Sequence, residues 1–360
     1  MLIGQGCNKM KVNFVLPPIG SSGGIDVIYK YVDLLQKSGY DVCVYKAILA
    51  NNMHRYHSNV KNIIHQIYCT AKTVFEKEKY RRTSDCFVWK ICNKTIRDAD
   101  VTIATAWPTA FEVYRLSVSK GNKFYFIQDY EIWDNPEVVK KSYQLPLNKI
   151  VISTWINDCL KHDLGMGPFP IVYNGLDTSV YHLTAQKKTG NEISFLMLNH
   201  KLSKKGVSNG LTAFEEVKKK YLDAKLRMFG MCDNTNLPED VEYFQNPSKD
   251  KIVELYSQAD FFIFPSLEEG WGLTPLEAMA CGCIVVGTRT GFVLDLGKHR
   301  ENMMVSEPGD IDDMVQNIEE VLSNQTLSKK IQKNAVKTAK SLDWKKSANK
   351  LMDILHCYTD

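Results

Sequence analysis

Short apolar runs alternate with helical patterns along the whole chain, and this alternation limits the fold more than any other feature. Buried parallel strands are typically apolar runs separated by helices. In the first half the strands are predicted at 11–16, 41–45, 101–104, 123–128 and 149–153. In the second half they are predicted at 193–198, 225–229, 241–244, 261–264 and 283–287. The pattern predicts an α/β fold with two doubly wound, Rossmann-like sheets.

Helical patterns separate these runs, and one turn-rich break divides the chain. The helices are predicted from 27–38 to 154–164 in the first half and at 209–221, 249–258, 275–280, 311–323 and 327–341 in the second. The break Gly165-Met-Gly-Pro-Phe-Pro170 lies between the halves. We therefore expect domains at 1–168 and 169–342, a division that suits 360 residues. The ligand is expected in a central cleft between them, at the carboxyl ends of the strands.

The charge of the chain is uneven. The 45 Lys and Arg residues exceed the 41 Asp and Glu residues by only +4, which argues against a nucleic-acid-binding protein. Between Arg55 and Arg97, however, ten basic residues face three acidic ones, with apolar residues at helical spacing among them. This stretch is interpreted as an amphipathic helix. Its basic face has three readings: peripheral contact with an anionic membrane, a solvated surface, or a surface turned toward an anionic substrate.

Other sequence features exclude some classes of protein. No apolar run reaches the roughly 18 residues of a membrane-spanning helix, and the N-terminus lacks the apolar segment of a signal peptide. The ten cysteines are irregularly spaced and contain no Cys-x-x-Cys, which favours reduced thiols. The eight histidines show no metal-binding spacing, so no metal site is predicted. A cytoplasmic protein is expected, either free or peripheral at the inner face of the membrane.

A Gly-rich segment follows the first predicted strand. It runs Pro17-Pro-Ile-Gly-Ser-Ser-Gly-Gly24 and precedes a helix. Glycines at such a position let backbone N–H groups approach an anion where the helix dipole is positive. A plain tight turn explains the same residues equally well. The segment departs from G-x-G-x-x-G, and no acidic residue ends the second strand, so NAD binding is not predicted.

A longer motif follows the predicted strand 261–264. It reads Phe264-Pro-Ser-Leu-Glu-Glu-Gly-Trp-Gly-Leu-Thr-Pro-Leu-Glu277-Ala-Met-Ala-Cys-Gly282. Pro275 is typical of a helix opening, and Glu277 is expected in the first turn. The N–H groups of Gly272, Leu273 and Thr274 would then form an anion site suited to a diphosphate. Carboxylates would repel a diphosphate, so Glu269 and Glu277 should bind neutral hydroxyls on either side of it. The plainer alternative is a helix start with two glutamates favoured by the dipole.

The spacing of seven residues between Glu269 and Glu277 resembles the retaining glycosyltransferases of the GT-B fold, family 4. Several other segments are similar to this family over residues 170–345. They are Val172-Tyr-Asn-Gly-Leu-Asp177, Lys201-Leu-Ser-Lys-Lys-Gly206, Gly287-Thr-Arg-Thr-Gly291 and Glu307-Pro-Gly-Asp310. The helix at Trp344 resembles the family's segment that returns to the first domain, here 343–360. In the first domain, Phe126-Ile-Gln-Asp-Tyr-Glu131 is similar to some bacterial rhamnosyltransferases.

The resemblance implies a GT-B fold and a nucleotide-diphospho-sugar donor held mainly by the second domain, without a required cofactor. Glu277 would accept hydrogen bonds from the ribose, and Glu269 from the transferred sugar. Lys201 and Lys205 would hold the diphosphate with the N–H groups of residues 272–274, and both lysines and Glu269 would support catalysis. On the first domain, Gly24 would lie on the donor side, and Gln128 and Asp129 on the acceptor or sugar side.

The sequence departs from the family pattern at several positions. Lys201 stands near the place of an arginine, with spacing one residue shorter than is common, so His200 is a rival for its role. Gln128-Asp129 replaces a His-Asp pair, and Gln128 cannot carry a proton. Phe292 follows Gly291 where the family has a second glycine, which would reshape the sugar pocket. Glu268 is interpreted as a bystander, and Asp129 and Glu131 as either acceptor-orienting or loop-capping residues.

The function predicted from these motifs is retaining transfer of a hexosyl or deoxyhexosyl group to a hydroxyl of a glycan or lipid-linked acceptor. Surface polysaccharide or glycoconjugate synthesis is the expected setting. Two alternatives stay open at this point. A nucleotide-sugar 2-epimerase would need more acid–base groups than the motifs provide. A non-catalytic nucleotide-sugar-binding subunit would retain the motif of the second domain, and Gln128 is compatible with it.

Overall fold

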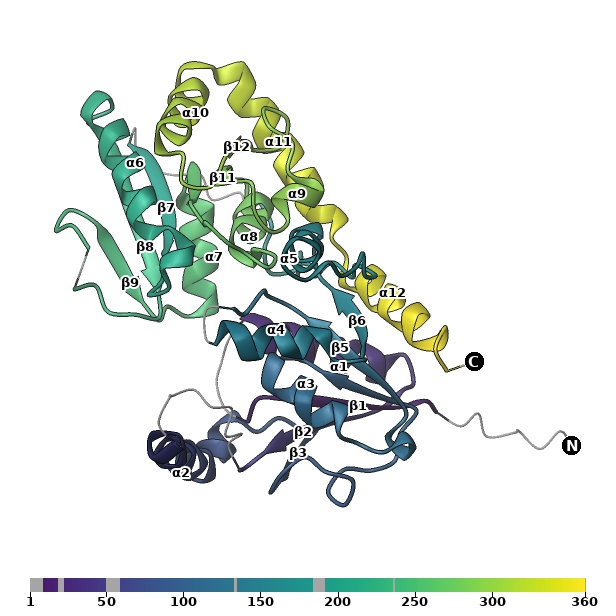
Figure 1. The fold of residues 1–360 in the computed structure, drawn as a ribbon. Coiled ribbons are helices and arrows are strands. Elements are labelled where there is room, and N and C mark those ends of the chain that lie inside the picture. The colour runs from purple at the N-terminus through teal and green to yellow at the C-terminus, as the bar shows by residue number, and fades with distance from the viewer. Residues whose placement is uncertain are drawn as a thin grey trace, which may run out of the picture. The chain divides into compact units, whose positions relative to one another are not determined.

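The structure is a computed structural model, which describes residues 9–18, 23–49, 59–132, 135–183, 192–235 and 237–359. The chain forms two compact units (Figure 1). The first unit comprises 1–152, 156–172 and 347–360, and the second comprises 153–155 and 173–346. In the part of the chain that is described, none of the helices is both long and apolar enough to cross a bilayer.

The first unit is built around a six-stranded parallel sheet. Its strands lie in the order β3-β2-β1-β4-β5-β6 and span Lys11–Leu16 (β1), Asp41–Ala47 (β2), Asp85–Val88 (β3), Val101–Ala104 (β4), Asn122–Ile127 (β5) and Asn148–Val151 (β6). In central β1 every residue after Lys11 is buried, because helices cover both faces of a doubly wound sheet. Phe14 of β1 pairs with Val44 of β2 and with Ile103 of β4, and all three side chains are buried.

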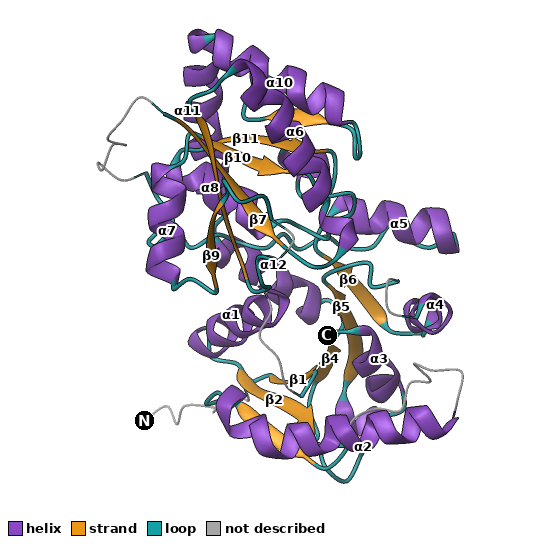
Figure 2. Cartoon of the chain, turned by 90° about the vertical axis from the view of Figure 1, so that its left-hand side faces the viewer, coloured by secondary structure: helices purple, strands orange, loops and turns teal. Residues whose placement is uncertain are grey.

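Helices follow most of these strands along the chain. They are α1 (Gly23–Lys37), α2 (Asn59–Glu76), α3 (Trp107–Tyr114), α4 (Pro136–Gln144) and α5 (Thr154–Leu164), with short 3₁₀ segments at Lys77–Tyr80 and Val118–Lys120 (Figure 2). Helix α1 buries Tyr31 and Leu35 among the residues of the sheet. Tyr31 contacts Phe126 of β5 edge to face, with ring centroids 5.4 Å apart.

The second unit repeats this architecture. Its parallel strands lie in the order β12-β11-β10-β7-β8-β9 and span Ile193–Asn199 (β7), Ala224–Gly230 (β8), Glu242–Gln245 (β9), Phe261–Phe264 (β10), Ile284–Thr288 (β11) and Met304–Ser306 (β12). Its helices are α6 (Val207–Lys220), α7 (Lys249–Gln258), α8 (Leu273–Cys281), α9 (Val293–Leu296), α10 (Ile311–Ser323) and α11 (Gln325–Ser341), with a 3₁₀ turn at Ser203–Lys205. Phe195, Met197 and Ile263 lie in its core with residues of α6 and α10.

Both sheets reverse their strand order at one place, next to the first strand of each unit. In the first sheet this place lies between β1 and β4, and in the second it lies between β7 and β10. Loops that leave two such neighbouring strands diverge to opposite faces, which leaves a crevice at the carboxyl ends where ligands bind. We therefore expect a ligand site of the second unit at the loops that follow β7 and β10.

Three features of the sequence interpretation need correction. The stretch 55–97 is not one helix: α2 ends at Glu76, and β3 follows at Asp85–Val88. Strand β3 was not predicted because it is a four-residue edge strand whose apolar residues continue the spacing of the preceding helix. Strand β12 was also not predicted, since three residues are too few to form a pattern. Arg55 lies outside the described residues.

Helix α12 (Trp344–His356) begins in the second unit, and residues 347–360 belong to the first. In the second unit a Cβ at Gly175 would lie 2.6 Å from Trp344 atoms, so only glycine permits this approach. In the first unit Tyr40 Oη is 2.7 Å from His356 Nε2, and the Asn122 side chain donates to the carbonyl of Tyr358 at 2.6 Å. The C-terminal residues are thus part of the first unit's structure.

Candidate functional site

Two side chains from different loops meet at the crevice of the second unit. Lys205 ends the 3₁₀ turn that follows β7, and Glu269 lies in the loop that follows β10. Lys205 Nζ is 2.6 Å from Glu269 Oε2, and the two side chains are 19% and 15% exposed. Lys204 is also buried, so this turn is packed against the protein and not simply solvated. The structure therefore brings together two of the predicted site residues.

Backbone contacts hold these two loops against each other. Gly206 has a positive φ of 62°, and a Cβ there would lie 2.0 Å from the carbonyl oxygen of Pro265. The carbonyl of Lys204 accepts hydrogen bonds from the N–H groups of Leu267 and Glu268, at 2.7 and 3.2 Å. Glycine is required at 206 for both reasons, and the lysine that precedes it is placed by this contact.

Helix α8 begins directly after this loop. Gly272 is its N-cap with φ 93°, and Leu273 is its first residue. Pro275 is therefore the third helical residue and Glu277 the fifth, which corrects the predicted opening at Pro275 and the predicted place of Glu277 in the first turn. The N–H groups of the first turn of a helix have no partners within the helix and carry the positive end of its dipole. The arrangement favours an anion at residues 272–274.

Glu277 points into a different environment from Glu269. Tyr256 of α7 donates a hydrogen bond to Glu277 Oε2 at 3.0 Å. Burial raises the pKa of Glu277, while hydrogen bonds from Tyr256 and Tyr181 act in the opposite direction. A desolvated carboxyl whose partners are tyrosine hydroxyls lies in an environment suited to neutral hydroxyl donors.

The two other predicted cation candidates have contacts of their own. Lys201 Nζ is 3.2 Å from Asp233 Oδ2, and both side chains are more than half exposed. His200 Nδ1 accepts the N–H of Leu202 at 3.1 Å, and burial followed by repulsion from Lys205 and Lys204 lowers the pKa of His200. A neutral imidazole is a poor substitute for a cation. Of the three residues, Lys205 is the one that the structure places beside Glu269.

The loop after β11 contacts the loop after β10, and the two loops contain residues that the sequence interpretation missed. A Cβ at Gly291, which has φ 54°, would lie 2.4 Å from the carbonyl oxygen of Trp271 and 3.1 Å from Glu269 Cγ. Trp271 stacks on Tyr173 at 5.1 Å. The indole N–H of Trp271 and the hydroxyl of Thr290 are both buried without a hydrogen-bond partner. Buried unpaired polar groups are costly, and they mark places where a ligand can supply the partner. Both residues lie within motifs that the sequence had singled out.

In the first unit the structure brings together Gly24 and Gln128. Gly24 is the second residue of α1, and Gln128 follows β5. A Cβ at Gly24 would lie 3.5 Å from Gln128 Oε1, an ordinary contact that leaves little room for anything larger. Gln128 Oε1 is buried and has no hydrogen-bond partner. Residues 19–22 of the Gly-rich segment lie outside the described residues.

The side chains of Asp129 and Glu131 accept hydrogen bonds from backbone N–H groups. Asp129 Oδ1 accepts the N–H of Tyr130 at 2.9 Å. Glu131 Oε2 accepts the N–H of Trp107, the first residue of α3, at 3.0 Å. Glu131 thus has the loop- and helix-capping role that was one of its two readings. Asp129 has further interactions, so its side chain is not free of partners.

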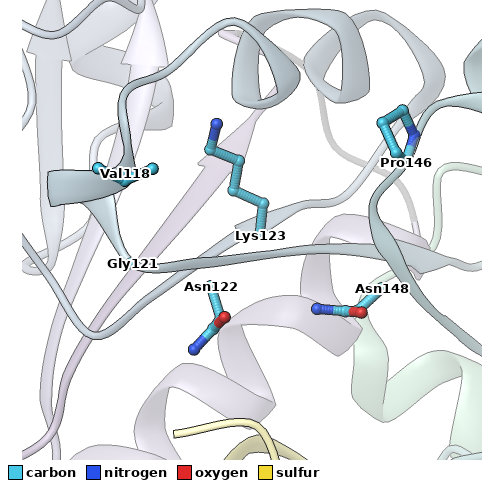
Figure 3. Close-up of a pocket in the computed structure, with 6 residues that line it drawn as sticks. All are labelled: Val118, Gly121, Asn122, Lys123, Pro146 and Asn148. Atoms are coloured by element: carbon cyan, nitrogen blue, oxygen red, sulfur yellow. The ribbon is translucent and has the colours of Figure 1, made fainter.

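One pocket of the first unit has none of these residues in its lining. It has a volume of about 370 Å³ and is lined by Val118, Gly121, Asn122, Lys123, Pro146 and Asn148 (Figure 3). Asn122 and Asn148 are the first residues of β5 and β6, so the pocket lies at the amino ends of the strands. Ligands of doubly wound sheets bind at the opposite edge, and we do not assign this pocket to the site. Among the described residues, no three His, Cys, Asp or Glu side chains form a group that could hold a metal.

The second unit is similar in sequence to known proteins. Residues 183–338 match the family model of the glycosyl transferases group 1. The similarity to this family therefore lies in the second unit. An uncharacterized glycosyltransferase of Methanocaldococcus jannaschii is 24% identical over 202 residues, which are 55% of this chain and 56% of that protein. CapM of Staphylococcus aureus, a capsular polysaccharide biosynthesis glycosyltransferase, is 25% identical over 142 residues, 37% of either chain. The chain thus spans about half or less of these curated relatives.

Solved structures extend the similarity to both units. Sucrose-phosphate synthase from Thermosynechococcus elongatus has a TM-score of 0.73 at 14% identity, with 97% of this chain and 98% of that chain covered. Anabaena HepE, solved in complex with UDP and glucose, has a TM-score of 0.68 at 14% identity, with 97% and 100% covered. At this identity the similarity concerns the fold alone. The predicted GT-B fold, with two α/β units, is confirmed.

Proposed function

We propose that this protein is a retaining glycosyltransferase of family 4, which moves a hexosyl or deoxyhexosyl group from a nucleoside diphospho-sugar to an acceptor hydroxyl. The observation that carries the proposal is the contact between Lys205 and Glu269 at the carboxyl ends of β7 and β10, directly before the first turn of α8. A cation, a helix N-terminus and a hydroxyl-binding carboxylate are the three groups that such a donor requires.

The diphosphate binds at the positive groups in this proposal. Lys205 and the N–H groups of residues 272–274 address its oxygens, and the charge that develops on the leaving phosphate is stabilised by the same groups. Lys205 is held by Glu269 before the donor arrives, so its rotamer is already restricted. Lys201 is the second cation proposed for the diphosphate, and it would have to exchange its exposed contact with Asp233 for the phosphate.

The two glutamates bind the neutral parts of the donor. Glu269, once Lys205 turns to the phosphate, accepts hydrogen bonds from hydroxyls of the transferred sugar. Glu277 accepts them from the ribose, and Tyr256 donates a hydrogen bond to its Oε2. The unpaired indole N–H of Trp271 and hydroxyl of Thr290 support a polar ligand near Gly291. HepE was solved in complex with UDP and glucose, which makes uracil the first base to test.

The proposed mechanism places little covalent chemistry on the protein. We infer departure of the diphosphate and entry of the acceptor hydroxyl on the same face of the sugar, with the leaving phosphate taking the proton. Anomeric configuration is then retained, and the protein contributes positioning and electrostatic stabilisation. No cofactor or metal is needed for this scheme, because Lys205 and the α8 N-terminus supply positive charge.

The first unit is proposed to contribute the acceptor or sugar side. The unpaired Oε1 of Gln128, next to Gly24, can accept a hydrogen bond from a sugar hydroxyl. A glycan or lipid-linked acceptor and a cytoplasmic setting are proposed from the motifs, and CapM supports a role in polysaccharide synthesis. The similarity of residues 126–131 to rhamnosyltransferases stays a prediction.

The test is a donor panel followed by a transfer assay. Thermal shift with UDP-, GDP-, ADP- and dTDP-sugars should show one selective donor, and EDTA should not change the shift. With that donor, release of nucleoside diphosphate should depend on the acceptor, and NMR should show a product with the donor's anomeric configuration. Glu269→Gln should reduce transfer, whereas the adjacent Glu268→Gln should not. Donor binding without acceptor-dependent release for any acceptor would favour a non-catalytic subunit, and an inverted product would refute retention.

A further inference from the structure

Helix α2 has the reverse of the usual surface-helix pattern, because its polar side chains are buried and its apolar side chains are exposed. The side chains that it buries are polar: Asn62 is 4% exposed and Thr73 is 1% exposed. Its large apolar side chains face solvent, where Ile67 is 63% exposed and Phe75 is 86% exposed. The other exposed apolar members are Val60, Ile63, Ile64, Tyr68 and Val74. Figure 2 shows this helix along the outside of the first unit.

The exposed residues form one continuous face. At about 100° per residue, the seven apolar side chains fall within an arc of roughly 140°, and Asn62, Cys69 and Thr73 fall on the opposite side. An isolated exposed apolar residue is normal, but a contiguous apolar face in solution marks a surface with a partner. We call Val60, Ile63, Ile64, Ile67, Tyr68, Val74 and Phe75 the α2 face.

Cations flank the α2 face. Lys61 and Lys72 lie on one border of the arc, at positions from which long side chains can extend past the apolar residues. Lys77, Lys79, Arg81 and Arg82 follow directly after the helix. Arg82 is paired with Asp26 of α1 at 2.5 Å, so Lys77 and Lys79 are the cations of this segment that the proposal uses. Glu78 is paired with Arg81 at 2.7 Å. The surroundings of the face are therefore positive.

We propose that the α2 face docks on the surface of an anionic lipid bilayer, with the helix lying in the interface. An apolar arc buried among the acyl chains, bordered by lysines that reach the headgroups, is the pattern of an interfacial helix. The helix is not a membrane span, and its partner must match both the apolar arc and the positive border. An anionic bilayer matches both. This inference goes beyond the proposed function, and its test does not depend on any donor or acceptor.

The test is sedimentation of the full chain with vesicles of phosphatidylcholine alone and of phosphatidylcholine mixed with phosphatidylglycerol. We expect binding to the mixed vesicles that is at least tenfold stronger and that weakens with added salt. The double variant Ile67→Ser, Phe75→Ser should lose most of this binding. Its matched control is Val118→Ser, Leu222→Ser, because these side chains are 92% and 81% exposed outside α2. All four sites are exposed, so the thermal unfolding midpoint should stay unchanged.

A second pair of variants tests the cations. Lys72→Gln with Lys79→Gln should weaken binding to the mixed vesicles by roughly fivefold for each cation removed. Lys329→Gln with Lys333→Gln, at exposed positions of α11, should leave it unchanged. Failure to bind the mixed vesicles, or equal binding by the α2-face variant, would overturn the proposal. Self-association that the α2-face variant abolishes, without vesicle binding, would overturn it in favour of a second copy of this chain.

Discussion

Lys205 Nζ lies 2.6 Å from Glu269 Oε2, across the two loops that leave β7 and β10. The pair is mostly buried, and it stands where the strand order of the second sheet reverses. A carboxylate there, three residues before the N-terminus of α8, is compatible with anion binding only because the lysine compensates it. In the proposed function, this contact joins the carboxylate that would bind the sugar to the lysine that would bind the diphosphate.

Removing this lysine should weaken nucleotide binding strongly. Lys205→Ala should cost about 1.5–3 kcal/mol of binding free energy for a nucleoside diphosphate, the scale of hydrogen bonds to charged groups. Isothermal titration would measure it. Lys201→Ala is the comparison, and its exposed contact with Asp233 predicts a loss of less than about 1 kcal/mol. Equal losses for both variants would show that Lys201 is as important for the diphosphate as Lys205.

Glu277 should matter for the nucleoside rather than for the sugar. Glu277→Ala should weaken binding of the free nucleoside diphosphate by ~1–3 kcal/mol, since its carboxylate would no longer accept the ribose hydroxyls. Tyr256→Phe keeps the carboxyl and should cost only about 0.5–1.5 kcal/mol, by loosening its 3.0 Å hydrogen bond. Titration with the nucleoside diphosphate distinguishes the two variants. Unchanged affinity in Glu277→Ala would refute the ribose role.

The space between Gly24 and Gln128 should limit what position 24 accepts. A Cβ there lies 3.5 Å from Gln128 Oε1, so Gly24→Ala should be tolerated and Gly24→Leu should displace the amide. We expect transfer by the leucine variant to fall at least about tenfold, which is about 1.4 kcal/mol in the activation barrier. Donor binding, measured separately, shows which substrate is affected. Full activity of Gly24→Leu would exclude a function for this contact.

Glu112 of α3 should make stability depend on pH. Burial raises the pKa of Glu112 from 4.5 to about 7, with Arg115 acting weakly against the shift. Because the folded state binds the proton more tightly, the free energy of unfolding should fall as pH rises from about 4.5 to about 7, by up to about 3 kcal/mol. Urea unfolding across this range would measure the change. Glu112→Gln should remove it, whereas Glu215→Gln, at an exposed position, should not.

Much of the fold could be predicted from the chain alone because its strands are strongly apolar and its helices are long. Strands β1, β4 and β10 and helices α5, α7 and α10 begin and end where the pattern places them. Strands β3 and β12 could not be predicted, because the apolar residues of β3 continue the spacing of the preceding helix and β12 has only three residues. The motif 264–282 located the loop with Glu269, but its spacing placed the start of α8 two residues late.

The linear pattern was enough for the order of the elements, the two parallel sheets and the motif, because each of these depends on local spacing and on the burial of apolar runs. The amphipathic character of α2 was also legible in the sequence. Contacts between residues that are far apart in the chain could not be predicted from the sequence. Lys205, rather than Lys201 or His200, meets Glu269 because Gly206 lets its turn approach Pro265, and α2 turns its polar side inward. Such choices depend on packing between segments that are far apart in the chain, and a linear pattern contains no information about which side of a helix or turn will find a partner.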